Sequence, residues 1–585
     1  MKNFKKAISL ILTLVLMITL VGCSKKTDSS DTENSSSEVS NAPTSAATDD
    51  SEAASETKNL YGYDTPVKIK IGVAMASDFS YAADETANDN VWMDLYRANN
   101  IDPEILFEVD SSQGATKMAT AILSGDYPDI IGEQPSEVAK YAADGTTADI
   151  TDAYNEYASD QLKEYLNSDG GLALESCKVN GRLYALPQMV NGYDSVMLMF
   201  IRQDWLDNLG LSMPTTMDEL KTVAHAFTFD DPDGNGVADT YGLALDGVDV
   251  FASMGGVQAV FEGYGAPMGA TAPTFVKGED GKLAWGGTFA PQMKAGLQLL
   301  QDMYKDGSLA KDFITMDGNS IFEESSAGRC GIWFGPMWAG MTAASALLKT
   351  VPASHITSAK VPDGLGAGTG KAYFSSSPST YCGVSSKCAN PEVLIKLMNL
   401  SVQKLCYPES PEEFVKYYGE AGKYSGWKTS LTYTLAPLKN YDNYKKESAA
   451  LLSGDTSGLN TEQLGDYTNM KAFLDGKDKA DFNPEDAAVQ AGVALYTVFG
   501  DLEGGYGALD KLITNKLITP SAYNSLPTDL MAEKTPTLNK LAAETIIKII
   551  TGESVDSYDD FLQNWKSLGG DDITAEAQAW ADANQ

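Results

Sequence analysis

The sequence is poor in the residues that most often bind metals or act in catalysis. Among 585 residues there are only two histidines, His225 and His355, and six cysteines. Neither histidine lies in a recognisable catalytic motif, and the sequence contains no G-x-S-x-G elbow. The cysteine spacing matches no zinc signature, and no Walker or Rossmann glycine pattern is present. Serine-hydrolase, zinc-site and nucleotide-binding functions are therefore disfavoured.

Cysteine pairing is limited by number. Besides Cys23 the chain carries five cysteines, an odd number that cannot all pair internally: Cys177, Cys330, Cys382, Cys388 and Cys406. We expect buried, unpaired thiols, with a Cys382–Cys388 bridge as the alternative.

Positive charge is scarce relative to negative charge. The 43 Lys and Arg residues face 80 Asp and Glu residues, which gives a formal net charge of −37. Nucleic-acid binding needs clustered Lys and Arg, so this balance argues against a nucleic-acid partner. Beyond the N-terminal segment, no apolar run reaches the roughly 20 residues that a membrane-spanning helix needs.

The N-terminus is typical of a secretory signal. Lys2, Lys5 and Lys6 precede an apolar run from Ala7 to Gly22, too short for an ordinary membrane span. The run ends in "LVGC", which resembles the bacterial lipobox. The resemblance implies cleavage after residue 22 and lipid modification of Cys23, including a diacylglyceryl group and palmitate; the alternative is an ordinary signal with a chance cysteine. Two acyl chains would hold the protein stably at a membrane, whereas one chain binds only marginally.

Residues 23–58 are expected to form a tether. The segment is rich in Ser, Thr, Asp and Glu and has almost no large apolar side chains, so it cannot bury enough surface to order itself. As a flexible coil it would span about 30–35 Å.

The start of the remaining chain predicts a β-α-β unit. Val67–Met75 alternates as a strand, "EILFEVD" is a second strand, Ala115–Ser124 a helix and Asp129–Gly132 a short strand. This order predicts a parallel sheet whose ligands lie beyond the carboxyl ends of its strands. The expected rim residues are Ser77, Asp78, Phe79, Gly132, Glu133 and Gln134.

Several blocks resemble extracellular solute-binding protein family 1, the substrate-capturing lipoproteins of ABC importers, especially the long type associated with oligosaccharides. The blocks are "NGRLYALPQ", the run from "FIRQDW" to Leu243, "TAILSGDYPDIIG", "SSAGRCGIWFGPMWAG" and the segment starting "ETIIKIITGESV". The resemblance implies an α/β, two-lobed periplasmic-binding-protein-like fold, with discontinuous lobes, central β-sheets flanked by helices, and a hinge between the lobes. We expect lobe 1 to comprise 59–190 and 341–430, and lobe 2 to comprise 191–340 and 431–585, the last including the C-terminal helices.

One loop, "DDPDGNGVADTYGL" from Asp230 to Leu243, has oxygen-bearing side chains at alternate positions, as in an EF-hand. Gly236 stands at the sharp turn, but Gly242 replaces the closing Glu. In a subset of the resembled family such a loop binds one structural calcium, which implies the ligands Asp231, Asp233, Asn235, the Val237 carbonyl and Asp239. Thr240 stands where relatives often have an acid, so weaker binding is expected.

Two alternatives to a structural calcium site are open. Asp, Asn, Pro and Gly are also turn formers, so the loop could be a plain turn. Dockerin modules use similar loops in pairs, whereas this sequence has one copy. A calcium sensor is disfavoured because no matched helix pair with the closing Glu is present.

Sugar sites combine aromatic platforms with planar hydrogen-bonding groups. The resemblance places a cleft aromatic at Trp338, and the Gly-rich loop "EAGKYSGWK" offers Tyr424 and Trp427. Trp333 neighbours Trp338, whereas four tryptophans in helical patterns are assigned to the core: Trp92, Trp205, Trp565 and Trp580. The candidate ligand-binding residues are Trp338, Trp427, Asp78, Glu133, Gln188 and Arg202.

The resemblance implies a binder rather than an enzyme. A monomer would close on an oligosaccharide or other polar solute at the outer face of a Gram-positive membrane and deliver it to ABC permease subunits. The best alternative is a lipid-anchored polysaccharide hydrolase or lyase. Such an enzyme needs two carboxylates at a defined separation, and no pair stands out among 80 acids. We therefore expect no catalytic residues and no organic cofactor.

Overall fold

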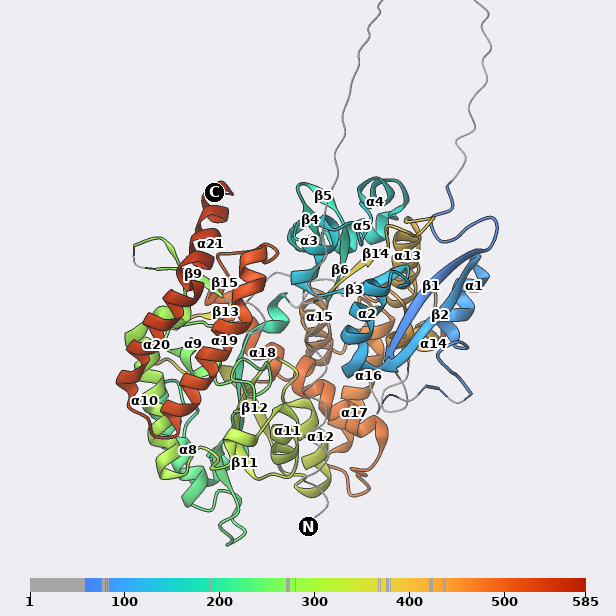
Figure 1. The fold of residues 1–585 in the computed structure, drawn as a ribbon. Coiled ribbons are helices and arrows are strands. Elements are labelled where there is room, and N and C mark those ends of the chain that lie inside the picture. Colours follow the sequence, from blue (N-terminus) through green and yellow to red (C-terminus); the bar gives the residue numbers. More distant parts are fainter. Residues whose placement is uncertain are drawn as a thin grey trace, which may run out of the picture. The chain divides into compact units, whose positions relative to one another are not determined.

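The computed structural model describes residues 58–584 except for a set of short segments: 76–78, 80, 83, 190–191, 270–273, 279, 367, 369, 375–377, 379, 420–424 and 435–437. The tether and Cys23 therefore fall almost entirely outside the described residues, as do Ser77, Asp78 and Tyr424. The helices and strands of the described part are labelled in Figure 1.

The first strands form as the sequence predicts. β1 (Val67–Met75) pairs in parallel with β2 (Ile101–Asp110), and α1 (Val91–Ala98) connects them. Alternation along β1 buries Ile69, Ile71 and Val73, the pattern of a strand with one face on a core. The helix predicted at Ala115–Ser124 is part of α2 (Ser111–Ser124).

The third predicted strand has a different partner from the one expected. β3 (Ile130–Glu133) pairs antiparallel with β14 (Thr380–Val384), which also pairs antiparallel with β6 (Ala185–Met189). Of the three strands predicted for the β-α-β unit, only β1 and β2 pair in parallel, and the sheet around β3 is antiparallel. The partner strand comes from about 250 positions further along the chain, so local periodicity could not reveal it.

A second sheet has the strand order β12-β7-β11-β8. β7 (Leu198–Arg202) lies between β12 (Ile356–Lys360) and β11 (Cys330–Gly335), antiparallel to both, while β11 runs parallel to β8 (Tyr241–Leu243). Every residue of β7 and β11 is buried, as expected for central strands covered on both faces.

Helices surround the second sheet. α8 (Met217–Phe229) begins directly after Thr216, because the Thr216 side chain accepts from the Glu219 amide in a capping box. α10 (Ala290–Asp306), α19 (Asp529–Ile550) and α20 (Tyr558–Trp565) pack against one another (Figure 1). α19 also contacts α21 (Asp571–Ala583), and α20 contacts the turn that precedes α21.

The described residues form two large hydrophobic cores. The first core gathers β1, β6, β14, α1 and α13 (Val393–Cys406), and the second core gathers β7, β11, α8, α10 and α19. The chain passes from one core to the other between β6 and β7, between β13 (Ala372–Phe374) and β14, and again before α15 (Lys439–Ser453).

One expected lobe boundary does not coincide with the place where the chain changes from one core to the other. α12 (Met341–Thr350) and β12 belong to the second core, so the return to the first core comes at β14 rather than at residue 341. The reason is that the β12 strand completes the second sheet beside β7, a pairing between segments some 150 residues apart.

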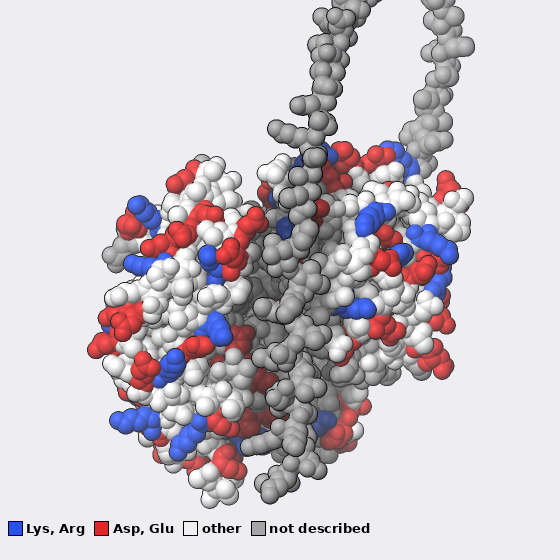
Figure 2. All heavy atoms as spheres, viewed as in Figure 1, with Lys and Arg blue, Asp and Glu red and all other residues white. Residues whose placement is uncertain are grey.

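The remaining sequence predictions concern cysteines and tryptophans. All five described cysteines are free thiols, which excludes the Cys382–Cys388 bridge, but only Cys177, Cys330 and Cys382 are buried, whereas Cys388 and Cys406 are half-buried. Trp92, Trp205 and Trp565 are buried and Trp580 packs on the second core. Searched across its described part, the chain shows no helix with the length and apolar character of a membrane span. Figure 2 shows acidic side chains spread over the visible face, with basic ones interspersed rather than gathered into one basic surface among the described residues.

Candidate functional site

Trp338 lies in the turn that follows the buried strand β11. The strand ends at Gly335, where Pro336 cannot continue a ladder. The half-buried Trp338 ring stacks on Phe322 with ring centroids 6.2 Å apart. Its neighbour Trp333 is fully buried and donates its indole N–H to the Ala339 carbonyl at 3.0 Å. Trp333 is therefore a core residue that holds the turn carrying Trp338.

Trp427 belongs to the first core and is also half-buried. It lies in a short 3-10 helix, Gly426–Thr429, and its ring centroid is 4.5 Å from that of Tyr433. The turn is fixed because the indole N–H of Trp92 donates to the Gly426 carbonyl at 3.0 Å. The two aromatic candidates thus come from different cores, each held by contacts on one side.

Glu133 does not lie open on the rim of its strand. It is 1 % exposed, and neither carboxylate oxygen has a hydrogen-bond partner. Burial, together with the nearby Glu137 carboxylate, raises the pKa of Glu133 well above its ordinary value. A side chain at Gly383 would collide with it, so Glu133 points beneath β14. Gly132 and Gln134, its neighbours, are the exposed residues here.

Arg202 is engaged inside the protein. It is 2 % exposed, and its guanidinium donates to both carboxylate oxygens of Asp204, at 2.8 and 2.5 Å. It also lies 4.6 Å from the Trp205 ring. This pairing gives Arg202 a structural role rather than a solvent-facing one. Of the predicted hydrogen-bonding candidates, Gln188 is half-buried in β6, and Asp78 lies outside the described residues.

Where the chain passes between the two cores, polar and aromatic side chains from distant segments meet in a junction that the sequence did not reveal. Asp194 follows β6 and accepts from the Asn440 amide at 2.7 Å and from the Tyr506 hydroxyl. Burial raises the pKa of Asp194 to about 6, against the opposing effect of these two hydrogen bonds. The adjacent Tyr193 ring lies 5.3 Å from Phe374, at the end of β13. Only the three-dimensional structure brings these distant segments together.

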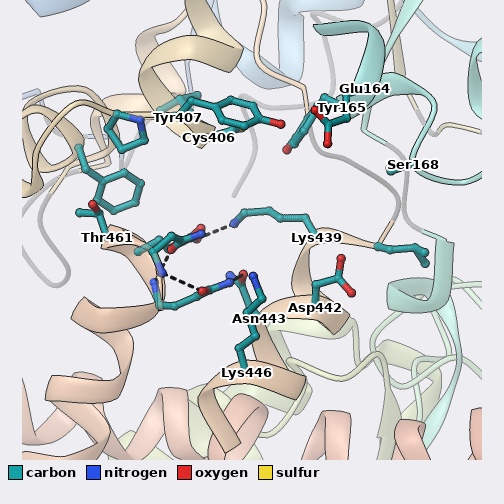
Figure 3. Close-up of a pocket in the computed structure, with 17 residues that line it drawn as sticks. Glu164, Tyr165, Ser168, Cys406, Tyr407, Lys439, Asp442, Asn443, Lys446 and Thr461 are labelled. Carbon is teal, nitrogen blue, oxygen red and sulfur yellow. Dashed lines mark hydrogen bonds and ion pairs between the residues drawn. The ribbon is translucent and has the colours of Figure 1, made fainter. Parts of the chain in front are cut away.

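A cavity of about 260 Å³ lies between the first core and helices α15 and α16 (Thr461–Gly476). Figure 3 shows Tyr165 and Tyr407 on one side and Lys439, Asp442 and Asn443 on the other. Lys439 forms a 2.5 Å ion pair with Glu462. Burial opposes the charge of Lys439, but the Glu462 carboxylate together with Tyr418 and Tyr433 outweighs it and holds the pKa of Lys439 well above its ordinary value. None of the predicted sugar-binding residues lines this cavity.

The predicted calcium loop has the backbone turns that such a site needs. Asp231, Gly234 and Gly236 have φ of 49°, 68° and 75°, and the Gly236 amide donates to the Asp231 carboxylate at 3.1 Å. The Asn235 amide donates to Asp233 at 2.8 Å and to Asp239 at 3.3 Å.

These contacts gather the carboxylates of the loop. Burial and the neighbouring Asp239 and Asp231 carboxylates raise the pKa of Asp233, although the Asn235 amide opposes the shift. Mutual repulsion of this kind is what a cation would relieve. Thr240 instead donates its hydroxyl to the Phe227 carbonyl at 2.9 Å, away from the loop. As they stand, no three Asp, Glu, His or Cys side chains in the described part are close enough to hold a metal. The carboxylate, amide and carbonyl oxygens of the loop are nevertheless the ligand types that calcium takes.

Comparison with known proteins agrees with the architecture. The family model of the bacterial extracellular solute-binding proteins matches residues 79–402, more than half of the chain. The chain belongs to this family. The polygalacturonan/rhamnogalacturonan-binding protein YtcQ of Bacillus subtilis is 25 % identical over 508 residues, covering 83 % of this chain and 87 % of YtcQ.

Two further relatives extend the comparison. Lipoprotein LipO of Bacillus subtilis is 32 % identical over 181 residues, 30 % of this chain and 33 % of LipO. The solved structure of the Streptococcus pneumoniae ABC-transporter substrate-binding protein FusA with kestose has a TM-score of 0.61 at 17 % identity, covering 89 % of this chain and all of FusA. The fold of this solute-binding protein is therefore two-lobed, and its two cores are the cores of the lobes.

Proposed function

We propose that this solute-binding protein captures an oligosaccharide between its lobes and delivers it to the permease of an ABC importer. The observation that carries the proposal is the pair Trp338 and Trp427. Each is half-buried, each is packed against a second aromatic ring on one side, and the two belong to different lobes. Aromatic faces of this kind match the apolar C–H faces of sugars. The names of YtcQ and FusA support a carbohydrate ligand.

Binding without catalysis is the second part of the proposal. The relatives are named as binding proteins, which favours this reading over a lipid-anchored polysaccharide hydrolase or lyase. The test is incubation with a panel of pectic and fructose-based oligosaccharides, followed by calorimetry and a reducing-end assay. Stoichiometric binding without new reducing ends is expected, and sustained release of reducing ends would overturn the proposal.

Lobe closure would couple binding to delivery. A ligand that contacts both lobes only in the closed form shifts an open–closed equilibrium towards closure. Small-angle scattering of the monomer should then give a smaller radius of gyration with the right sugar than without it. An unchanged radius at saturating sugar would contradict closure.

A lipid anchor at Cys23 would keep the protein at the outer face of the cell membrane. Its support is the lipobox-like "LVGC" and the similarity to a protein named as a lipoprotein. Mass spectrometry of the protein expressed in a Gram-positive host should find acyl chains on Cys23, and the Cys23→Ser chain should appear in the medium. A wild-type chain without acyl modification would rule out the anchor.

One structural calcium ion is the last part of the proposal. Asp231, Asp233, Asn235, Asp239 and the Val237 carbonyl would hold it, and the ion would neutralise carboxylates that otherwise repel one another.

A further inference from the structure

The cavity beside α15 and α16 is small. Its volume of about 260 Å³ lies below the ~300–1,000 Å³ that is usual for small-molecule sites. Its volume therefore matches a solute of about one ring. Trp338 and Trp427 do not line it, so it is distinct from the residues proposed for oligosaccharide capture.

One wall of the cavity is aromatic. Tyr165, Tyr407 and Phe414 contribute rings from the side of the first lobe. Phe414 is fixed by stacking on Tyr418, with centroids 4.7 Å apart and planes inclined by 16°. Tyr407 is 37 % exposed, so it stands where a solute can enter. Such a wall offers flat apolar faces to the C–H groups of a saturated ring.

The opposite wall carries fixed amides. Asn443 is 3 % exposed and its carbonyl oxygen accepts from the Gln463 amide at 2.9 Å. Gln463 is itself fixed, because its side-chain oxygen accepts from the Asn460 backbone amide at 2.9 Å. An asparagine has two N–H donors as well as its oxygen, so the held Asn443 amide still has hydrogen-bonding capacity for a hydroxyl group.

Charge selects against an anion. The cavity is lined by two lysines, Lys439 and Lys446, and by three carboxylates: Glu164, Asp442 and Glu462. Lys439 is already paired with Glu462 at 2.5 Å, so its charge is neutralised within the wall. The other charged residues of the lining are one cation, Lys446, and two carboxylates, Glu164 and Asp442. A uronate or phosphate would meet net repulsion here, whereas hydroxyl groups could bond to both amides and carboxylates.

We propose that this cavity is a second binding site that takes one neutral polyhydroxylated ring, a free monosaccharide or a cyclic polyol. The site has an aromatic wall, a fixed amide opposite it and one more carboxylate than lysine in its lining, and its volume matches one ring. The proposal does not rest on oligosaccharide capture by the two tryptophans.

Calorimetry and saturation-transfer NMR on the full chain test the proposal, with galactose, glucose, myo-inositol and galacturonate as probes. We expect at least one neutral ring to bind with a Kd of roughly 1–10 mM and galacturonate to bind at least about tenfold more weakly than galactose. Tyr407→Ala and Asp442→Leu should each weaken the neutral ring about tenfold or more. Both positions are solvent-exposed, so these variants should fold, as a circular-dichroism spectrum would verify.

Asp475→Leu is the matched control. Asp475 is an exposed carboxylate on α16 that pairs with Lys471 and does not line the cavity. This variant should bind the ring within about twofold of wild type. Three outcomes would each overturn the proposal. The first is that no neutral probe binds, down to an affinity 100-fold below the expected one. The others are unchanged binding of the neutral ring in both cavity variants, or tighter binding of galacturonate than of the neutral ring. A chain that binds the neutral ring as described but no oligosaccharide would keep this inference and refute the proposed function.

Discussion

The ammonium group of Lys396 lies 4.6 Å from the centre of the Tyr157 ring, inside the protein where a lysine is rarely found. It is 3 % exposed, lies 4.7 Å from the Tyr63 ring as well, and donates to the carbonyls of Gly62 and Asn59. Lys396 therefore ties helix α13 to Asn59 and Gly62, which directly follow the expected tether.

Replacing Lys396 by Met should lower the free energy of unfolding by about 2–4 kcal/mol, because the buried Gly62 carbonyl and the partly buried Asn59 carbonyl lose a charged donor. Urea denaturation measures this loss, and limited proteolysis should cut earlier within residues 58–63. Lys428→Met is the control: Lys428 is exposed and 5.5 Å from a Trp427 ring, so its loss should cost no more than about 0.5 kcal/mol. Equal stability of the two variants would contradict the structural role of Lys396.

Glu447 gives the protein an unusual dependence on pH. It is fully buried, and both of its carboxylate oxygens lack a partner. Burial, followed by the Asp466 and Glu462 carboxylates, raises its pKa far above the ordinary 4.5. The folded state therefore holds a proton that the unfolded state releases. This contribution to stability is complete below pH 4.5 and is lost as pH rises through neutrality towards the folded pKa.

Between pH 5 and pH 8 the ionisation of Glu447 should remove up to about 1.4 kcal/mol of stability per pH unit from the wild-type protein, the limit for one proton. Glu447→Gln cannot ionise, so its stability curve should be flatter over this range. Thermal melts at constant ionic strength measure the slopes, with the exposed Glu104→Gln as the control that keeps the wild-type slope. Parallel curves for wild type and Glu447→Gln would show that Glu447 is ionised in the folded protein.

Sequence patterns sufficed where structure is local. The bounds of β1, the cap at Thr216 and the buried tryptophans follow from alternation, capping chemistry and helical spacing. The family resemblance supplied the two lobes, which no local pattern contains. β14 could not be assigned to β3, because that pairing depends on a segment that returns after some 250 residues.

The candidate site was predicted less well than the fold. Glu133 and Arg202 are polar residues at the ends of strands. Residues that line the rim of a binding site also stand at strand ends, so the sequence does not separate the two kinds. What distinguishes them is the packing above them: β14 covers Glu133, and Asp204 neutralises Arg202. The junction of Asp194 with Tyr506 was missed for the same reason, since its partners are more than 300 residues apart.

Calcium should stabilise the protein through the loop around Asp233. Binding to the folded state alone raises the melting temperature, by roughly a few degrees for a ligand in large excess over its Kd. Asp233→Ala removes a central carboxylate and should abolish the increment. Differential scanning fluorimetry with calcium or with chelator measures it, and Asp478→Ala, an exposed acid elsewhere, should keep the wild-type response. The loop is a plain turn if Asp233→Ala responds to calcium as wild type does.

Trp338 and Trp427 should contribute to oligosaccharide affinity from opposite lobes. Each ring is packed on one side, by Phe322 and Tyr433 respectively, so truncation to Ala removes a fixed platform without opening a fully buried core. We expect each single variant to weaken binding at least about tenfold, since an aromatic contact at a ligand commonly exceeds 1 kcal/mol. Phe229→Ala is the control, because Phe229 is 53 % exposed at the end of α8 and remote from both turns. Calorimetry gives the affinities and scattering gives closure: if both tryptophan variants bind and close as wild type does, the ligand is held by other residues and the pairing of these two rings across the lobes is wrong.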